Sequence, residues 1–302
     1  MIQFPPYLKK GSTIGITCPA GYMALEKVQA CIHTLQSWGY HVVTGKTIGS
    51  DSSNYFSAPD EERLNELQHM LDDDSIDAIL FGRGGYGTGR IIDQINFKKF
   101  RKQPKWLIGF SDITLLHQHL LSKYKIASLH APMAAAFNNT DGVRYIEMLK
   151  ETLKGKKLTV TTEPHPFNLT GKVTGILTGG NLSMLCHATG SSSEIKTRDR
   201  ILFLEDVGEY IYNIDRMMYH LKRSGKLSGI KGLILGGFTD LKDTERPFGM
   251  QIDDLFHRFT QNLQIPVCFH FPVSHGTNNV PLKIGGTYQL QITTKEVTLK
   301  EK

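Results

Sequence analysis

The chain of 302 residues has few cysteines and no long apolar run, and both absences narrow what it can be. No stretch approaches the roughly 20 apolar residues that cross a bilayer, and residues 1–6 lack the basic and apolar regions of a signal peptide. We therefore expect a cytoplasmic protein with no membrane contact. The cysteines form no CxxC pair, so we expect buried free thiols. They are Cys18, Cys31, Cys186 and Cys268.

An excess of one charge is also missing. The formal net charge is only +6, and the lysines are scattered rather than gathered in a basic stripe with interleaved aromatic residues. This pattern does not favour a nucleic-acid partner. No HExxH motif is present, and His117 and His119 lie two residues apart on an expected helix, where they point to different faces. We therefore expect no catalytic metal.

The first half of the chain alternates short apolar strands with helices. This alternation predicts an α/β domain with a mostly parallel sheet flanked by helices, and sites in such sheets form beyond the carboxyl ends of the strands. The expected strands are residues 12–18, 40–44, 77–82, 106–110 and 127–130. The expected helices are residues 24–38, 57–71, 88–94, 113–122 and 141–152.

The pattern changes after the glycine- and lysine-rich residues 154–157. The second half contains glycine pairs, strand patterns at 200–204 and 232–238, a helix pattern at 213–223 and a terminal hairpin at 287–300. We therefore predict a nucleophile domain at residues 1–153, a linker at 154–168, and a smaller β-rich C-terminal domain at 169–302.

The strongest chemical signal is Ser111, which stands between an apolar strand pattern and a helix pattern. A serine at such a strand-to-helix turn is typical of a nucleophile elbow, where unpaired helical N–H groups favour an oxyanion. Alternatively, Ser111 or Asp112 only caps the helix. Ile113 replaces the second glycine of G-x-S-x-G, which weighs against an ordinary α/β-hydrolase.

A second signal is the stretch 82–89, which holds five glycines in eight residues. Gly82, Gly84 and Gly87 match G-x-G-x-x-G, with Asp112 placed 25 residues later as a ribose-binding acid, so a nucleotide-binding oxidoreductase is one alternative. A tight loop with no ligand is another. The favoured interpretation is a loop that donates an oxyanion-hole N–H beside Ser111.

A catalytic serine needs a base, and the second half offers one in a polar loop. His275 follows a strand and is flanked by serine, glycine and asparagine, as in loops that line a site. Glu205 and Asp206 end another apolar strand, where an acid either orients a histidine or is a surface charge. The pattern alone does not choose between these two acids.

Taken together, these segments resemble the LD-carboxypeptidase family, whose other branch is the microcin C self-immunity peptidases. The resemblance spans essentially the whole chain, and the matching segments stand in the family's order. They are residues 81–87, 108–112, 179–182, 203–206 and 272–276.

The resemblance implies a Ser-His-Glu triad of Ser111, His275 and Glu205, with the backbone N–H groups of Gly85 and Asp112 as the oxyanion hole. It also implies hydrolysis of the L–D bond that releases the terminal D-alanine of murein tetrapeptides in cell-wall recycling, by a homodimer that uses no metal or organic cofactor.

A carboxypeptidase must recognise a free carboxylate, and Arg83 in the glycine-rich stretch is the candidate for this contact. The chain length favours the recycling branch, and a microcin C-type self-immunity peptidase is the alternative within the family. Outside the family, the alternatives are the nucleotide-binding oxidoreductase and a catalytically silent ligand-binding protein.

Overall fold

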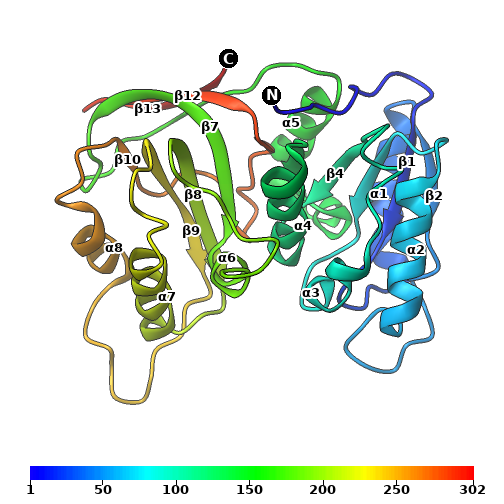
Figure 1. Ribbon diagram of the computed structural model, residues 1–302, viewed down its shortest axis with the longest axis horizontal. Coiled ribbons are helices and arrows are strands. Elements are labelled where there is room, and N and C mark those ends of the chain that lie inside the picture. The colour runs from blue at the N-terminus through cyan, green and yellow to red at the C-terminus, as the bar shows by residue number, and fades with distance from the viewer. The chain divides into compact units, whose positions relative to one another are not determined.

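The computed structural model describes all residues from 1 to 302, which form two compact units (Figure 1). The first comprises Met1–Lys156 and Val280–Lys283, and the second comprises Lys157–Asn279 and Ile284–Lys302. The change of unit at residues 156–157 falls inside the stretch 154–168, for which the sequence predicts a linker. That stretch also contains strand β6 (Thr159–Thr162), and four later residues return to the first unit.

The first unit is built on a six-stranded sheet in the order β11-β5-β4-β3-β1-β2. The neighbours among β1 to β5 pair in parallel, which confirms the predicted parallel sheet. The strands are β1 (Thr13–Thr17), β2 (His41–Thr44), β3 (Ala78–Phe81), β4 (Trp106–Gly109), β5 (Ser128–His130) and β11 (Leu282–Ile284). The chain moves outward from β1 to β2 and then returns to β3 on the other side of β1. The carboxyl ends of β1 and β3 thus form a topological switch point, where ligands bind in such sheets.

Helices cover both faces of this sheet because its central strands are apolar on both sides. Residues of α1 and α5 share one core with Ile14 and Ile16 of β1. On the opposite face, Gly15 lies against Met70 of α2. The helices are α1 (Gln29–Ser37), α2 (Asp60–Asp72), α3 (Thr88–Ile91), α4 (Thr114–His119) and α5 (Val143–Leu153).

The second unit holds a seven-stranded sheet in the order β10-β9-β8-β7-β12-β13-β6. Strands β7 to β10 pair in parallel, and β12, β13 and β6 extend the sheet antiparallel, so this unit is mixed and β-rich. The remaining bounds are β7 (Gly171–Asn181), β8 (Arg200–Val207), β9 (Gly232–Thr239), β10 (Val267–Cys268), β12 (Thr287–Ile292) and β13 (Val297–Glu301).

Three helices cover one face of this second sheet (Figure 1). Their apolar sides share a core with β8 and β9, through residues such as Leu202 and Leu233. They are α6 (Leu182–His187), α7 (Ile211–Arg223) and α8 (Ile252–Thr260). None of the helices in either unit combines the length and the apolar character that crossing a membrane requires.

Candidate functional site

Ser111 lies at the turn where β4 passes into a helix. Gly109 ends the strand, Phe110 stays extended, and Ser111 has φ +61°, in the left-handed region that non-glycine residues rarely adopt. A single 3-10 turn (Ser111–Ile113) follows and leads directly into α4. A serine in this strained position between a strand and a helix has the backbone geometry of a nucleophile elbow.

Two buried side chains hold this turn in place. The Asp112 carboxylate accepts a hydrogen bond from the backbone N–H of Thr88 (2.8 Å), the first residue of α3. On the other side, His117 Nε2 donates to the carbonyl of Gly109 (2.8 Å), because a carbonyl can only accept. Its Nδ1 then accepts from the Ser128 hydroxyl (2.8 Å), and burial lowers the pKa of His117 to about 4. His117 is thus a neutral side chain that holds the end of β4, before the turn, against β5.

The glycine-rich loop that follows β3 lies directly against Ser111. A Cβ added at Gly84 would lie 2.9 Å from the Ser111 Cβ and 3.0 Å from its Oγ. Gly85 is exposed with φ +100°, so its backbone is reachable and needs glycine's freedom. The glycines therefore let this loop approach the serine closely.

The same geometry argues against a dinucleotide site in this loop. A pyrophosphate binds the free N–H groups of a helix N-terminus. Here α3 has only four residues, and the N–H of its first residue, Thr88, is used by the Asp112 carboxylate. The Asp112 carboxylate, which the dinucleotide interpretation assigns to the ribose, instead binds the N–H group that a phosphate would need.

Arg83 and Tyr55 stand at the exposed edge of the loop. Arg83 is exposed, and its Nη1 donates to the carbonyl of Tyr22 (3.0 Å). The Tyr55 hydroxyl lies 2.7 Å from the position of a Cβ on Gly85, and the residue is 54% exposed. Sequence reasoning missed Tyr55, because an aromatic residue in a polar loop carries no local signal of the loop that it contacts.

In the second unit, His275 and Glu205 form a short hydrogen-bonded pair. His275 Nδ1 lies 2.6 Å from Glu205 Oε2, and Glu205 is fully buried near the end of β8. Burial raises the pKa of the Glu205 carboxyl, and the adjacent His275 partly offsets that effect. Burial by itself lowers the pKa of His275, but the charges of Glu205, Asp206 and Asp240 outweigh it, so the pKa of His275 is raised. The carboxylate thus stabilises a protonated imidazole.

Glycines of β9 allow the loop that carries His275 (the histidine loop) to approach the sheet. A Cβ on Gly236 would lie 2.2 Å from the Val273 carbonyl oxygen, and the Gly237 N–H donates to that same oxygen (2.9 Å). Two residues later the chain reaches His275. Gly236 and Gly237, one of the glycine pairs of the second half, are therefore required for packing beside the Glu205–His275 pair.

Asp206 has a different set of partners. Its carboxylate accepts from the Asn181 side chain (2.7 Å) and from both the backbone N–H (2.9 Å) and the hydroxyl (2.7 Å) of Ser183. These bonds tie the end of β7 and the start of α6 to β8. Of the two acids that the pattern left open, Glu205 is the one that contacts His275, while Asp206 holds a helix start.

One other group, His165, Asp253 and His270, has its ligand-type atoms within 4.8 Å of one another. The Nε2 of His270 lies 2.9 Å, and that of His165 3.6 Å, from Asp253 Oδ2. However, the backbone N–H of Phe167 donates to His165 Nδ1 (3.3 Å), so a neutral His165 carries its proton on Nε2, facing Asp253. The group fits a hydrogen-bonded cluster and does not fit a metal centre.

Comparisons with known proteins point to the same family, the LD-carboxypeptidases, along most of the chain. The family models for the LD-carboxypeptidase N-terminal and C-terminal domains match residues 14–131 and 174–290. A probable murein peptide carboxypeptidase of Bacillus subtilis is 32% identical over 98% of this chain and 94% of its own length. A murein tetrapeptide carboxypeptidase of Pseudomonas aeruginosa is 25% identical, over 92% of each chain.

Solved structures of such carboxypeptidases and of related proteins share the fold of this chain. A muramoyltetrapeptide carboxypeptidase from Oxalobacter formigenes superposes with a TM-score of 0.87 at 30% identity, covering 96% of this chain and 98% of its own. A microcin C7 self-immunity protein also has a TM-score of 0.87, at 21% identity over 100% of this chain and 99% of its own, a similarity of fold.

Proposed function

Because the chain belongs to the LD-carboxypeptidase family, we propose that it is a serine carboxypeptidase that releases the terminal D-alanine of murein tetrapeptides by hydrolysing the L–D bond. The observation that carries the proposal is Ser111, held at φ +61° between strand and helix with the glycine-rich loop against its hydroxyl. A strained serine of this kind is retained where its hydroxyl must project from the chain.

In the proposed reaction, Ser111 Oγ attacks the carbonyl carbon of the scissile bond. His275 Nε2 takes the serine proton and passes it to the departing amine of D-alanine as the C–N bond breaks. Water then attacks the acyl-enzyme with the same histidine as base, which frees the tripeptide and the serine. The 2.6 Å contact with Glu205 supports this role, because it keeps a proton on Nδ1 and leaves Nε2 to exchange protons.

The oxyanion of the tetrahedral intermediate would be bound by the backbone N–H groups of Gly85 and Asp112. Asp112 N stands in the first helical turn after the serine, where N–H groups lack intrahelical partners and the helix field is positive. The exposed Arg83 would bind the carboxylate of the terminal D-alanine through guanidinium donors. No step of this reaction calls on a metal or an organic cofactor.

We also propose that the enzyme acts in the cytoplasm, in cell-wall recycling, and as a homodimer. These follow from the family resemblance. Light scattering during size-exclusion chromatography tests the dimer, since a single peak at the 33.9 kDa of one chain would contradict it. Cell fractionation with an antibody to the chain tests the location, which would be wrong if the protein were secreted.

The reaction is tested by incubating the purified protein with murein tetrapeptide and following the loss of one D-alanine by mass spectrometry. Ser111→Ala should lower kcat by several orders of magnitude while the circular dichroism spectrum stays unchanged. A variant that keeps more than about a tenth of the activity would rule out Ser111 as nucleophile.

The same assay separates the two branches of the family. A parallel incubation uses aspartyl sulfamoyl adenosine, the compound bound in a solved structure of the microcin C7 self-immunity protein. Faster release of aspartate than of D-alanine would place this chain in the microcin C branch.

A further inference from the structure

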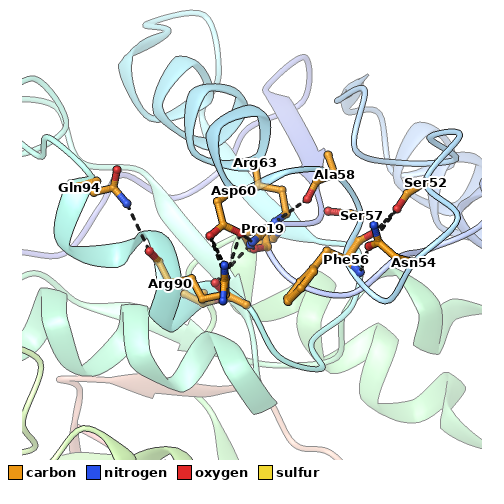
Figure 2. Close-up of polar contacts among 12 residues, drawn as sticks. Pro19, Ser52, Asn54, Phe56, Ser57, Ala58, Asp60, Arg63, Arg90 and Gln94 are labelled. Carbon is orange, nitrogen blue, oxygen red and sulfur yellow. Dashed lines mark hydrogen bonds and ion pairs between the residues drawn. The ribbon is translucent and has the colours of Figure 1, made fainter.

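Arg63, in the first turn of α2, is a fully buried arginine whose guanidinium donates hydrogen bonds to backbone carbonyls and to one acid. Its Nε donates to the carbonyl of Ala58 (3.0 Å), its Nη1 to those of Pro19 and Gly87 (3.2 Å for Gly87), and its Nη2 pairs with Asp60 (Figure 2). Burying a charge is costly unless it is paired and hydrogen-bonded. This set of partners is what makes the buried position tolerable.

The three carbonyls belong to segments that are far apart in sequence but meet at the switch point of the sheet. Pro19 follows β1, Gly87 ends the glycine-rich loop after β3, and Ala58 precedes α2. A planar guanidinium donates in several fixed directions at once, whereas a lysine ammonium is a single nitrogen. A Cβ on Gly87 would lie 2.9 Å from Arg63 Nη1, so loop and arginine fit only with glycine at that position.

One peptide group links this arginine to the serine turn. The carbonyl of Gly87, which accepts from Arg63, and the N–H of Thr88, which donates to Asp112 Oδ2 (2.8 Å), belong to the same peptide bond. That peptide plane is therefore held at its oxygen by a cation and at its nitrogen by an anion. Asp112 directly follows Ser111, so the orientation of the loop and that of the turn are fixed together.

Asp60 and Arg90 complete the arrangement from the solvent side. Arg90 contacts Asp60 through Nε and Nη2, each 2.8 Å from Oδ2. The Phe56 ring lies against both guanidinium groups, 4.9 Å from that of Arg63 and 5.4 Å from that of Arg90. In Figure 2 the Asp60 side chain lies between the two arginines. Asp60 therefore fixes the direction of the Arg63 fork without touching the loop itself.

We propose that Arg63, oriented by Asp60 and Arg90, is a positioning residue that sets the glycine-rich loop against Ser111 for catalysis. The inference rests on the proposed function, because it assigns this loop the oxyanion-binding N–H of Gly85. Displacing such a donor by about 1 Å can cost on the order of a hundredfold in rate. The loss falls on kcat, because the buried Arg63 contacts the loop backbone, Asp60 and Phe56 rather than the substrate.

The test compares Arg63→Lys and Asp60→Asn with the wild type in the D-alanine release assay. Asp74→Asn is the matched control, since it removes an exposed ion pair with Lys99 (3.3 Å) in the same unit, away from the loop. We expect kcat to fall about a hundredfold in Arg63→Lys and about fivefold in Asp60→Asn, with KM within threefold. Asp74→Asn should stay within about twofold.

Amide hydrogen exchange of residues 82–90 provides a second readout that does not depend on activity. Exchange there should become about tenfold faster in Asp60→Asn while the amides of β3 and β4 keep their wild-type rates. A lower melting temperature with unchanged kcat and unchanged local exchange would overturn the proposal, since Arg63 would then be structural only. If Arg63→Lys does not fold, Asp60→Asn decides by the same two measurements.

The two levels of inference fail differently. A wild-type protein that releases no D-alanine refutes the proposed function. Local exchange in Asp60→Asn still decides whether the arginine holds the loop.

Discussion

Gly84→Ala gives a direct test of how closely the glycine-rich loop must approach Ser111. The backbone of Gly84 is outside the left-handed region, so alanine is allowed there and the only penalty is steric. The new methyl carbon would lie 2.9 Å from the Ser111 Cβ, 3.0 Å from its Oγ and 3.4 Å from the Asp112 nitrogen. Carbon atoms in good contact are roughly 3.5–4.0 Å apart, so either the loop or the serine must move.

The size of the effect follows from the cost of overpacking. One extra methyl group in a packed site costs about 1–3 kcal/mol. If the serine is displaced from its reactive position, the same energy appears in the barrier, and each 1.36 kcal/mol is a factor of ten in rate. We therefore expect kcat/KM to fall by about 5- to 150-fold.

The assay is steady-state release of D-alanine, combined with the rate at which a fluorophosphonate labels Ser111. Gly175→Ala in β7 is the control, because its added Cβ would meet Ile201 at 3.4 Å, an ordinary contact, on a backbone that accepts alanine. If Gly84→Ala keeps kcat/KM within about twofold of an active wild type, the loop does not constrain the serine as we describe.

Three further variants test the two acids of the second unit and the buried His117 behind the serine turn. In Glu205→Gln, His275 loses the main charge that raises its pKa, so kcat should fall at least tenfold. The acid limb of the pH profile of kcat/KM, where the imidazole is protonated and inactive, should also move to lower pH. An acid limb at the wild-type pH would contradict the pairing of Glu205 with His275. Asp206→Asn should instead lower the free energy of unfolding in urea by about 2 kcal/mol, because it loses charged hydrogen bonds to the start of α6; a loss of kcat with full stability would show that the roles of the two acids are reversed. The pKa of His117, lowered to about 4, lies below its unfolded value of about 6.5, so the unfolded chain binds more protons and wild-type stability should fall by about 3 kcal/mol as the pH drops from 6.5 through 4. The free energy of unfolding in urea, measured at several pH values, should therefore fall less steeply with decreasing pH in His117→Gln than in the wild type. The same pH dependence in both proteins would contradict a buried neutral histidine.

Much of the first unit follows from local pattern. Strands such as Ala78–Phe81 are apolar on both faces, and only a sheet covered on both sides buries such a segment. The serine turn is also local, because an apolar strand, one serine and a helix start occupy adjacent residues. The glycine-rich loop is visible for the same reason, since its close approach to Ser111 requires residues without side chains.

Helix boundaries behind the serine needed the tertiary structure. The sequence predicts one helix over residues 113–122, whereas the chain forms a 3-10 turn, α4 and a π turn that ends at Tyr124. The bond from His117 to the Gly109 carbonyl is one of the contacts that hold this segment against β4. Periodicity reports which residues are apolar, and it does not report which backbone groups a buried side chain will contact.

The residue pattern left the choice between Glu205 and Asp206 open. The family resemblance implied Glu205, and the fold shows that Glu205 is the acid in contact with His275. Adjacent strand residues point to opposite faces of the sheet, so only one of the two can face the histidine loop, and the loop that decides it lies about 70 residues further along the chain. The contact of Arg63 with the Gly87 peptide is equally long-range, since it joins residues 24 apart through a backbone carbonyl that any amino acid would supply. Residue type and spacing determine elements and turns within a few neighbours. The partner of a buried charge depends on which distant segments pack against it, and only the tertiary structure decides that.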